Sequence, residues 1–427
     1  MSVATLVRRG GFRDLLVGQA VSGLGDWMGT IAFMALALEL TGSPTAVGGI
    51  LTLRLLPAAL GGPLAARAVR TWDRRRTMLA MDAARAVIVA GVPLVREIWW
   101  VYAGAILLEL AGLVFLPARD ASIPELVERD DLPVANGLVL GSSYGTIPLG
   151  AAAFAAVATL PFVDLFDRPL ALVFWIDALT FLISFAFIAR LTMLSQPSGS
   201  SRGGSGSPDE DVRFLAAFRL PLVRAVMPAA AAVALGLGAL FSIGIVFVQD
   251  VLDASQAEFG VLIALFGVGA AGGLGLLHIR RARDPLRETR IGVAAIGAIV
   301  AAFSIAASVA LADVGAVAFG AAAAFTLASG MGALQSCLDG NERVLAFAAF
   351  HVVIRFGLGV AAIVAGLAGD LLHDSGWLRD LHWPVVGVLE PARVVLLASG
   401  LLVLLVSGLV RISPPADATP IEQNAST

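Results

Sequence analysis

Long apolar segments alternate with short polar breaks along almost the whole chain. Six apolar segments in the first half predict helices near residues 12–40, 44–68, 77–96, 98–118, 134–160 and 168–192. Six more follow near residues 222–249, 257–278, 291–311, 313–336, 344–371 and 391–411. Most of these segments have at least the roughly 20 apolar residues that an α-helix needs to cross about 30 Å of hydrocarbon. The pattern therefore predicts an all-α polytopic membrane protein with twelve transmembrane helices.

The longest polar break separates the two sets of six helices. It contains a Gly/Ser-rich run at 195–208, followed by three acidic residues, and such a sequence is too polar to pack. A glycine-rich segment before an arginine-rich turn occurs at 61–64 and again at 272–275, which indicates an internal repeat. We expect four parts: an N-terminal six-helix bundle at 1–192, a flexible cytoplasmic linker at 193–221, a C-terminal six-helix bundle at 222–411 and a cytoplasmic tail at 412–427.

The composition agrees with a protein that is solvated by lipid. Hydrophobic residues make up 58% of the chain and charged residues 14%. All 29 basic residues are arginine, so the chain has no Walker A lysine and is not a P-loop ATPase. The single Cys337 permits no internal disulfide, and the four histidines lack the spacing of metal ligands. We expect no metal, no cofactor and no nucleic-acid partner.

The distribution of arginine predicts the orientation in the membrane. With the N-terminus in the cytoplasm, 22 arginines fall on the inner side and four in the outer loops. This asymmetry follows the positive-inside rule. The sequence therefore predicts a multi-pass protein of the cytoplasmic (inner) membrane with both termini in the cytoplasm.

A few ionisable residues interrupt the apolar segments near mid-membrane. A charged group at the centre of a membrane helix costs about 2.5–3.5 kcal/mol on insertion scales, so it usually has a partner or a wet cavity. Asp26 and Arg54 lie at similar depths in antiparallel neighbouring helices, and we expect them to form an ion pair. Glu109, Asp177 and Arg355 are the other candidates for a proton-coupling or substrate cavity.

Low-dielectric surroundings favour the protonated form of a carboxyl group, which suits reversible proton binding. Asp26 and Glu109 are the expected proton carriers. The alternative is a set of fixed ion pairs that only hold the helices together. For Asp177, in a helix expected at the periphery, fixed pairing is the favoured interpretation.

The polar turn after the second predicted helix is rich in glycine and arginine. Its simplest interpretation is a positively charged anchor on the cytoplasmic side. The turn also resembles the loop motif of the major facilitator superfamily, although Arg70 stands where that motif usually has aspartate. In that family the motif latches the closed cytoplasmic gate. The residues that the resemblance assigns to the gate are Gly62, Asp73, Arg74, Arg75 and Arg76.

The segment PARDASIPELVERDDLPVAN, at residues 117–136, carries the most specific resemblance. It is similar to the loop between the fourth and fifth helices in the branch of the same superfamily that contains macrolide and enterobactin exporters. Residues 22–27 in the first helix and 175–181 in the sixth helix agree with that branch, so the resemblance covers nearly the full length.

The fifth predicted helix contains Gly145, Pro148 and Gly150. These residues partly resemble the Gly-Pro motif of antiporters in the superfamily, with Ile147 in place of the glycine before proline. Small residues spaced along a helix also allow close packing in lipid, and proline bends the helix. Close packing is therefore the alternative explanation for the same residues.

The resemblance implies two pseudo-symmetric six-helix bundles and alternating access by a monomer. It also implies export of a small hydrophobic or amphipathic compound, of a drug, macrolide or siderophore type, by proton antiport. A proton-coupled uptake symporter and a non-transporting membrane sensor are the alternatives. A membrane-embedded enzyme is disfavoured, because it would need a nucleophile and base or a metal cluster at matching membrane depth, and none of the histidines has such partners.

Overall fold

The structure is a computed structural model that describes most of the chain. The described segments are residues 10–60, 72–128, 145–168, 170–191, 220–280, 284–337, 340–375 and 387–410, together with residues 6, 131, 132, 134, 135, 138, 139, 142, 218, 382 and 383. The predicted tail lies outside the described residues, as does the predicted linker except for residues 218, 220 and 221.

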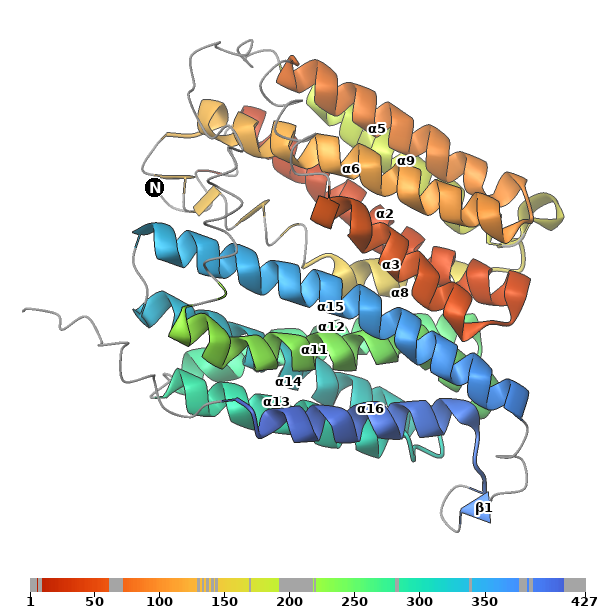
Figure 1. Cartoon of the computed structure of the whole chain (residues 1–427). Coiled ribbons are helices and arrows are strands. Elements are labelled where there is room, and N and C mark those ends of the chain that lie inside the picture. Colours follow the sequence, from red (N-terminus) through yellow and green to blue (C-terminus); the bar gives the residue numbers. More distant parts are fainter. Residues whose placement is uncertain are drawn as a thin grey trace, which may run out of the picture. The chain divides into compact units, whose positions relative to one another are not determined.

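Each of the twelve predicted spans corresponds to one α-helix in the described part of the chain (Figure 1). The helices of the first half are α2 (Gly10–Thr41), α3 (Pro44–Leu60), α5 (Arg74–Gly91), α6 (Ile98–Leu126), α8 (Ile147–Ala158) and α9 (Ala171–Ala189). Those of the second half are α11 (Pro221–Val246), α12 (Gln256–Arg280), α13 (Pro285–Phe303), α14 (Val309–Cys337), α15 (Gly340–Ser375) and α16 (Pro391–Ser407).

Short elements complete the described fold. The 3-10 helices η1 (Val92–Leu94) and η3 (Leu165–Asp167) lie in the first half, and α11 continues as the π-helix η4 (Phe247–Val251). Strands β1 (His382–Trp383) and β2 (Gly387–Val388) form a two-stranded antiparallel sheet before α16, with His382 opposite Val388.

The chain divides into two compact units. The first unit comprises Met1–Gly203 and Ser255–Ala264, and the second comprises Gly204–Ala254 and Leu265–Thr427. The first turns of α12 therefore group with the first unit, whereas the sequence analysis assigned all of 222–411 to one bundle. Gly260 explains the close packing of these turns, because a Cβ at this position would lie 2.8 Å from Phe154 of α8.

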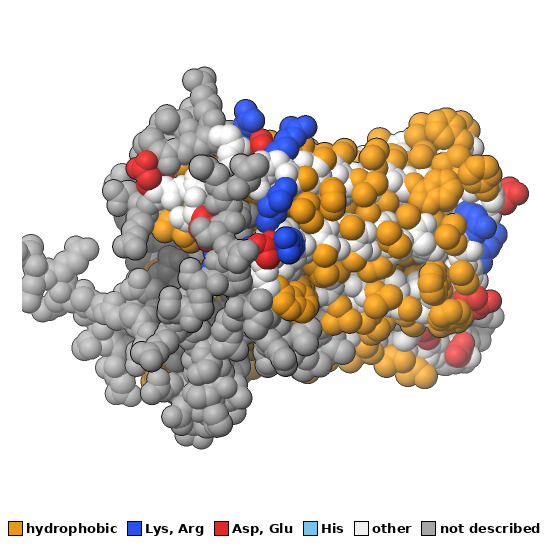
Figure 2. All heavy atoms as spheres, turned by 90° about the horizontal axis from the view of Figure 1, so that it is seen from above, with side chains coloured by type: hydrophobic (Ala, Val, Ile, Leu, Met, Phe, Trp, Pro, Cys, Tyr) orange, Lys and Arg blue, Asp and Glu red, His pale blue; other side chains and the backbone are white. Residues whose placement is uncertain are grey.

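The helices within each unit differ strongly in burial. In the apolar 18-residue stretch of α2, 78% of the residues are buried, and in that of α11, 72% are buried. These two helices therefore form the centres of their units. Other helices expose large apolar side chains, among them Val87, Leu179 and Leu405. Figure 2 shows such side chains covering much of one face, with arginine and acidic side chains gathered towards its two ends. Eight described helices are long and apolar enough to cross a membrane.

Helix α13 corrects the predicted span at 291–311. It begins at Pro285, after the N-cap Asp284, whose side chain accepts a hydrogen bond from the Arg287 backbone N–H, and it ends at Phe303. The prediction missed the charged first turns of α13, because a hydropathy pattern detects only the part of a helix that lies in the hydrocarbon layer of the membrane. The cap and the proline at the first position are the local signals that start the helix there.

Candidate functional site

The intramembrane charges of the first unit gather around Asp26 on α2. The ion pair that the sequence predicts between Asp26 and Arg54 of α3 is present, with Nη2 of Arg54 3.3 Å from Oδ1 of Asp26. The Asp26 side chain is 32% exposed, and that of Arg54 is 14% exposed. The pair is therefore sheltered, but one of its members remains accessible.

Helix α5 contributes a second ion pair, between Asp82 and Arg85, which are one helical turn apart. Both side chains are buried, and Nη1 of Arg85 also lies 4.0 Å from Oδ2 of Asp26. The Arg85 guanidinium lies between two aromatic rings, 4.1 Å from the centroid of Phe115 and 4.5 Å from that of Phe181. These cation–π contacts compensate part of the desolvation of the charge.

Asp82 and Arg85 were not among the candidates that the sequence analysis selected, although they belong to the same cluster. Their position near the end of the third predicted span made them look peripheral. The signal that would have found them is their spacing, because an acid and a base three residues apart in an otherwise apolar helix can pair on one face.

Asp177 on α9 is fully buried beside this network. Its Oδ1 accepts a hydrogen bond from Oγ1 of Thr180 at 3.4 Å, and its Oδ2 has no hydrogen-bond partner within the described part of the chain. It lies within electrostatic reach of Asp26, Arg54 and Arg85. The described contacts thus include no ion pair for Asp177, which argues against the fixed pairing that the sequence favoured.

We refer to Asp26, Arg54, Asp82, Arg85 and Asp177 as the charge cluster. It joins α2, α3, α5 and α9 in the first unit and combines three carboxyl groups with two guanidinium groups. The structure thus brings together three of the predicted cavity residues. Of the other two candidates, Glu109 is half-buried on α6, and Arg355 belongs to the second unit, where it is exposed on α15.

The predicted gate residues at the start of α5 make contacts inside the first unit. Asp73 is the N-cap of α5, and its side chain accepts a hydrogen bond of 2.7 Å from the Arg76 backbone N–H. Arg74 forms an ion pair with Glu125 near the end of α6. Arg75 donates hydrogen bonds of 2.5 Å to the carbonyl of Ala189 and 3.5 Å to that of Ile188, at the end of α9.

These contacts fasten the start of α5 to the ends of α6 and α9. Side chains that donate to the last carbonyls of a helix satisfy acceptors that the helix itself leaves open. Arg76 is exposed, and Gly62 lies outside the described residues. The described residues of the motif therefore make contacts within the first unit, and their part in a cytoplasmic gate stays a prediction.

The predicted Gly-Pro motif lies around the start of α8. Gly145 is in the turn before the helix, and Pro148 is in its first turn. A Cβ added at Gly150 would lie 2.7 Å from the carbonyl oxygen of Leu24 and from Cβ of Trp27, both on α2. Gly150 therefore allows α8 to approach α2 closely, as the packing explanation expects.

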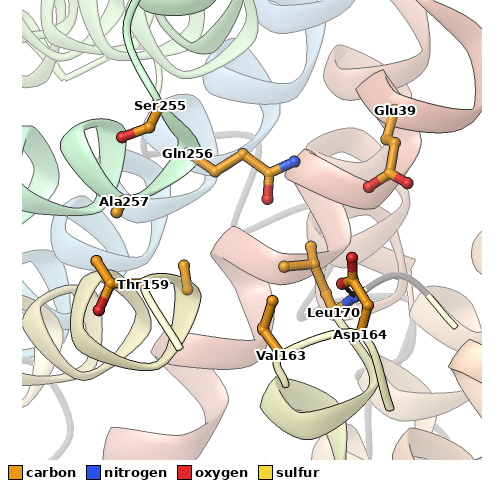
Figure 3. A pocket seen from close by; sticks show the side chains of 9 residues that line it. Glu39, Thr159, Val163, Asp164, Leu170, Ser255, Gln256 and Ala257 are labelled. Carbon is orange, nitrogen blue, oxygen red and sulfur yellow. Dashed lines mark hydrogen bonds between the residues drawn. The ribbon is translucent and has the colours of Figure 1, made fainter. Parts of the chain in front are cut away.

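A separate cavity of about 310 Å³ lies in the first unit near the C-terminal end of α2 (Figure 3). The carboxylates of Glu39 and Asp164 and the amide of Gln256 line it. Asp164 also accepts a hydrogen bond of 2.9 Å from the Leu170 backbone N–H. Glu39 follows Asp26 by thirteen residues, which is about 20 Å along a helix axis. The cavity is therefore distinct from the charge cluster.

Comparison with protein families and sequences gives consistent matches. The family model described as Major Facilitator Superfamily matches residues 15–316. The multidrug efflux pump Tap of Mycobacterium tuberculosis (strain ATCC 25618 / H37Rv) is 27% identical over 316 residues, which cover 68% of this chain and 71% of Tap. The uncharacterized MFS-type transporter YfiS of Bacillus subtilis (strain 168) is 30% identical over 117 residues, 27% of this chain and only 28% of the length of YfiS.

Solved structures show the same fold at low sequence identity. A bacterial homolog of the human lysosomal transporter Spinster, in an inward-facing and unoccupied conformation, superposes with a TM-score of 0.74 at 16% identity, covering 94% of this chain and 95% of the homolog. The nucleoside transporter NupG superposes with a TM-score of 0.73 at 12% identity, covering 94% of this chain and 98% of NupG.

Proposed function

Because the chain belongs to the Major Facilitator Superfamily, and is therefore a multi-pass membrane transporter rather than an enzyme, we propose that it exports a small hydrophobic or amphipathic compound by proton antiport with alternating access. The family expected from the sequence motifs is thus confirmed. The direction of transport, the chemistry of the compound and the coupling to protons are the parts of this account that we propose.

The charge cluster is the observation that carries the proton coupling. Its three carboxyl groups outnumber its two guanidinium groups, and it is sheltered among apolar helices. An excess of carboxyl groups over guanidinium groups in low-dielectric surroundings favours the binding of a proton, because the proton neutralises the extra negative charge. Asp26, the most accessible member, is the group through which the cluster exchanges protons with water. Glu109 is the second proposed carrier.

The likeness to Tap supports export as the direction, since that relative is a multidrug efflux pump. The apolar composition of the helices favours an apolar substrate over a sugar or a nucleotide. Drugs, macrolides and siderophores are compounds of this type. The protein works as a monomer in the cytoplasmic membrane, with both termini on the cytoplasmic side, as the asymmetric distribution of arginine supports.

Mass spectrometry of cells tests the proposal while the substrate is still unidentified. Small molecules inside and outside are compared in cells that express the wild type, Asp26→Asn, Glu109→Gln or no protein, first with the proton gradient intact and then after its collapse. We expect at least one compound that the wild type depletes from cells only with the gradient, and that the Asp26→Asn cells retain. Asp253→Asn, at an exposed aspartate outside the charge cluster, is the matched control and should export normally.

The alternatives give different results in the same experiment. Greater entry of a compound in cells with the wild-type protein would show a proton-coupled uptake symporter and contradict export. No change in any compound in any strain would remove the support for transport of a small molecule and favour a membrane sensor.

A further inference from the structure

Two glycines of α2 form a slot for the carboxyl group of Asp177. A Cβ added at Gly25 would clash first with Oγ1 of Thr180 and also with Oδ1 of Asp177, and one added at Gly29 would clash with Oδ2 of Asp177. The two glycines are four residues apart and therefore lie on the same face of the helix. Glycines at this spacing commonly admit the backbone of a neighbouring helix, but here they admit an ionisable side chain from α9.

Every charged group recorded near this slot belongs to the charge cluster. Helix α2 contributes Asp26, α3 contributes Arg54, and α5 contributes Asp82 and Arg85. Helix α8, which also packs on α9, contains no ionisable residue. The protonation of Asp177 therefore depends on these four groups.

The count of charges in the cluster favours the binding of one proton. With all five groups ionised, the cluster would carry one uncompensated negative charge among apolar helices, which is strongly unfavourable. One bound proton makes the cluster neutral. Asp82 pairs with Arg85, and Asp26 contacts both Arg54 and Arg85, whereas no ion pair to Asp177 is recorded among the described residues.

We propose that Asp177 holds the exchangeable proton of the cluster, in the glycine slot of α2, and that Asp26 relays this proton to water. Holding the proton on Asp177 is a property of the cluster itself. Its use in driving export rests on the proposed function. In the resting state the Asp177 carboxyl is neutral, and release of its proton to Asp26 leaves a buried carboxylate that draws the guanidinium groups of Arg54 and Arg85 towards it.

Infrared difference spectroscopy of the purified protein in lipid nanodiscs tests this assignment. Spectra recorded over a range of pH report the carbonyl stretching band of protonated carboxyl groups, and aspartate labelled with ¹³C separates aspartic from glutamic acids. We expect a wild-type aspartic acid band that persists at neutral pH and is lost completely in Asp177→Asn. The band remains in Asp253→Asn, the matched control at an exposed aspartate outside the charge cluster.

Thermal unfolding of the same samples supplies a second readout. Because asparagine resembles a neutral aspartic acid in size and charge, Asp177→Asn should keep the wild-type Tm, while Asp82→Asn should lower it by leaving Arg85 with one counter-ion fewer. Loss of the fold in Asp177→Asn would overturn the proposal, as would the absence of a wild-type band or its loss in Asp253→Asn.

The two proposals fail separately. If no compound is exported but the Asp177 band is present, the proton site stands and its coupling to export does not. If export depends on the gradient but the band is absent, the proton is carried elsewhere.

Discussion

Asp26 is the residue at which the two arginines of the cluster meet. Its Oδ1 contacts Arg54 at 3.3 Å, and its Oδ2 lies 4.0 Å from Arg85. Both contacts are longer than the best charge-assisted hydrogen bonds, which measure about 2.7–2.9 Å. The carboxylate of Asp26 is thus shared between two cations, and loss of either cation would leave it only partly compensated.

The ion pair between Asp26 and Arg54 predicts an asymmetry between single and double substitutions. Arg54→Gln should destabilise the protein by about 2 kcal/mol, between the values for exposed and buried pairs, because it leaves a sheltered carboxylate with one cation fewer. Adding Asp26→Asn should recover more than half of the lost Tm in detergent. Arg76→Gln should leave Tm unchanged, because Arg76 is exposed.

An equal loss of Tm in Arg54→Gln and Arg76→Gln would show that the recorded pair does not stabilise the fold. A double variant less stable than Arg54→Gln alone would show that Asp26 has a more important partner than Arg54.

At the scale of elements, glycines allow close packing on α2 in two different ways. Gly25 faces Thr180 and Asp177 of α9, and Gly29 faces Asp177, whereas the close approach of α2 to α8 uses Gly150 on α8. In contrast, Gly112 of α6 and Gly272 of α12 have no atom within 4 Å of an added Cβ. Glycine in these two positions is therefore not required by packing.

Substituting alanine should distinguish glycines that close packing requires from glycines that it does not require. Gly29→Ala should lower Tm by an amount equivalent to roughly 1–3 kcal/mol, because the new methyl group overlaps the Asp177 carboxyl. Gly112→Ala, the matched control, should raise Tm slightly, since alanine favours a helix by about 1 kcal/mol over glycine. If Gly29→Ala proved as stable as Gly112→Ala, the carboxyl slot would be refuted.

The sequence predicted the elements better than the contacts between them. Hydropathy located all twelve helices because each apolar segment is long, and the match in depth of Asp26 and Arg54 was enough to predict their pairing. The depth of Asp177 was predicted too, but its neighbours depend on the rotation of α9 about its axis, which hydropathy does not report. Arg393 illustrates the same limit: it is buried in α16 and donates to the carbonyls of Ser304 and Ala306, and hydropathy does not report such contacts.

On the scale of the whole molecule, orientation in the membrane is open to direct measurement. Phe162, in the connection between α8 and α9, is 55% exposed, and Ser205 belongs to the predicted cytoplasmic linker. In a Cys337→Ser background, a membrane-impermeant maleimide should label Phe162→Cys in intact cells. It should label Ser205→Cys only after permeabilisation. The reverse pattern would invert the proposed orientation.

The central claim is that outward movement of a compound is coupled to inward movement of protons. Its most direct test uses inside-out membrane vesicles acidified by respiration, with a fluorescent weak base that is quenched by the pH gradient, and a panel of amphipathic drugs. We predict that at least one drug restores fluorescence in wild-type vesicles, because it exchanges for lumenal protons, and that the response disappears in Asp26→Asn vesicles and in vesicles without the protein. If the drugs that the wild type exports from cells leave the quenched signal unchanged in wild-type vesicles, proton antiport is contradicted.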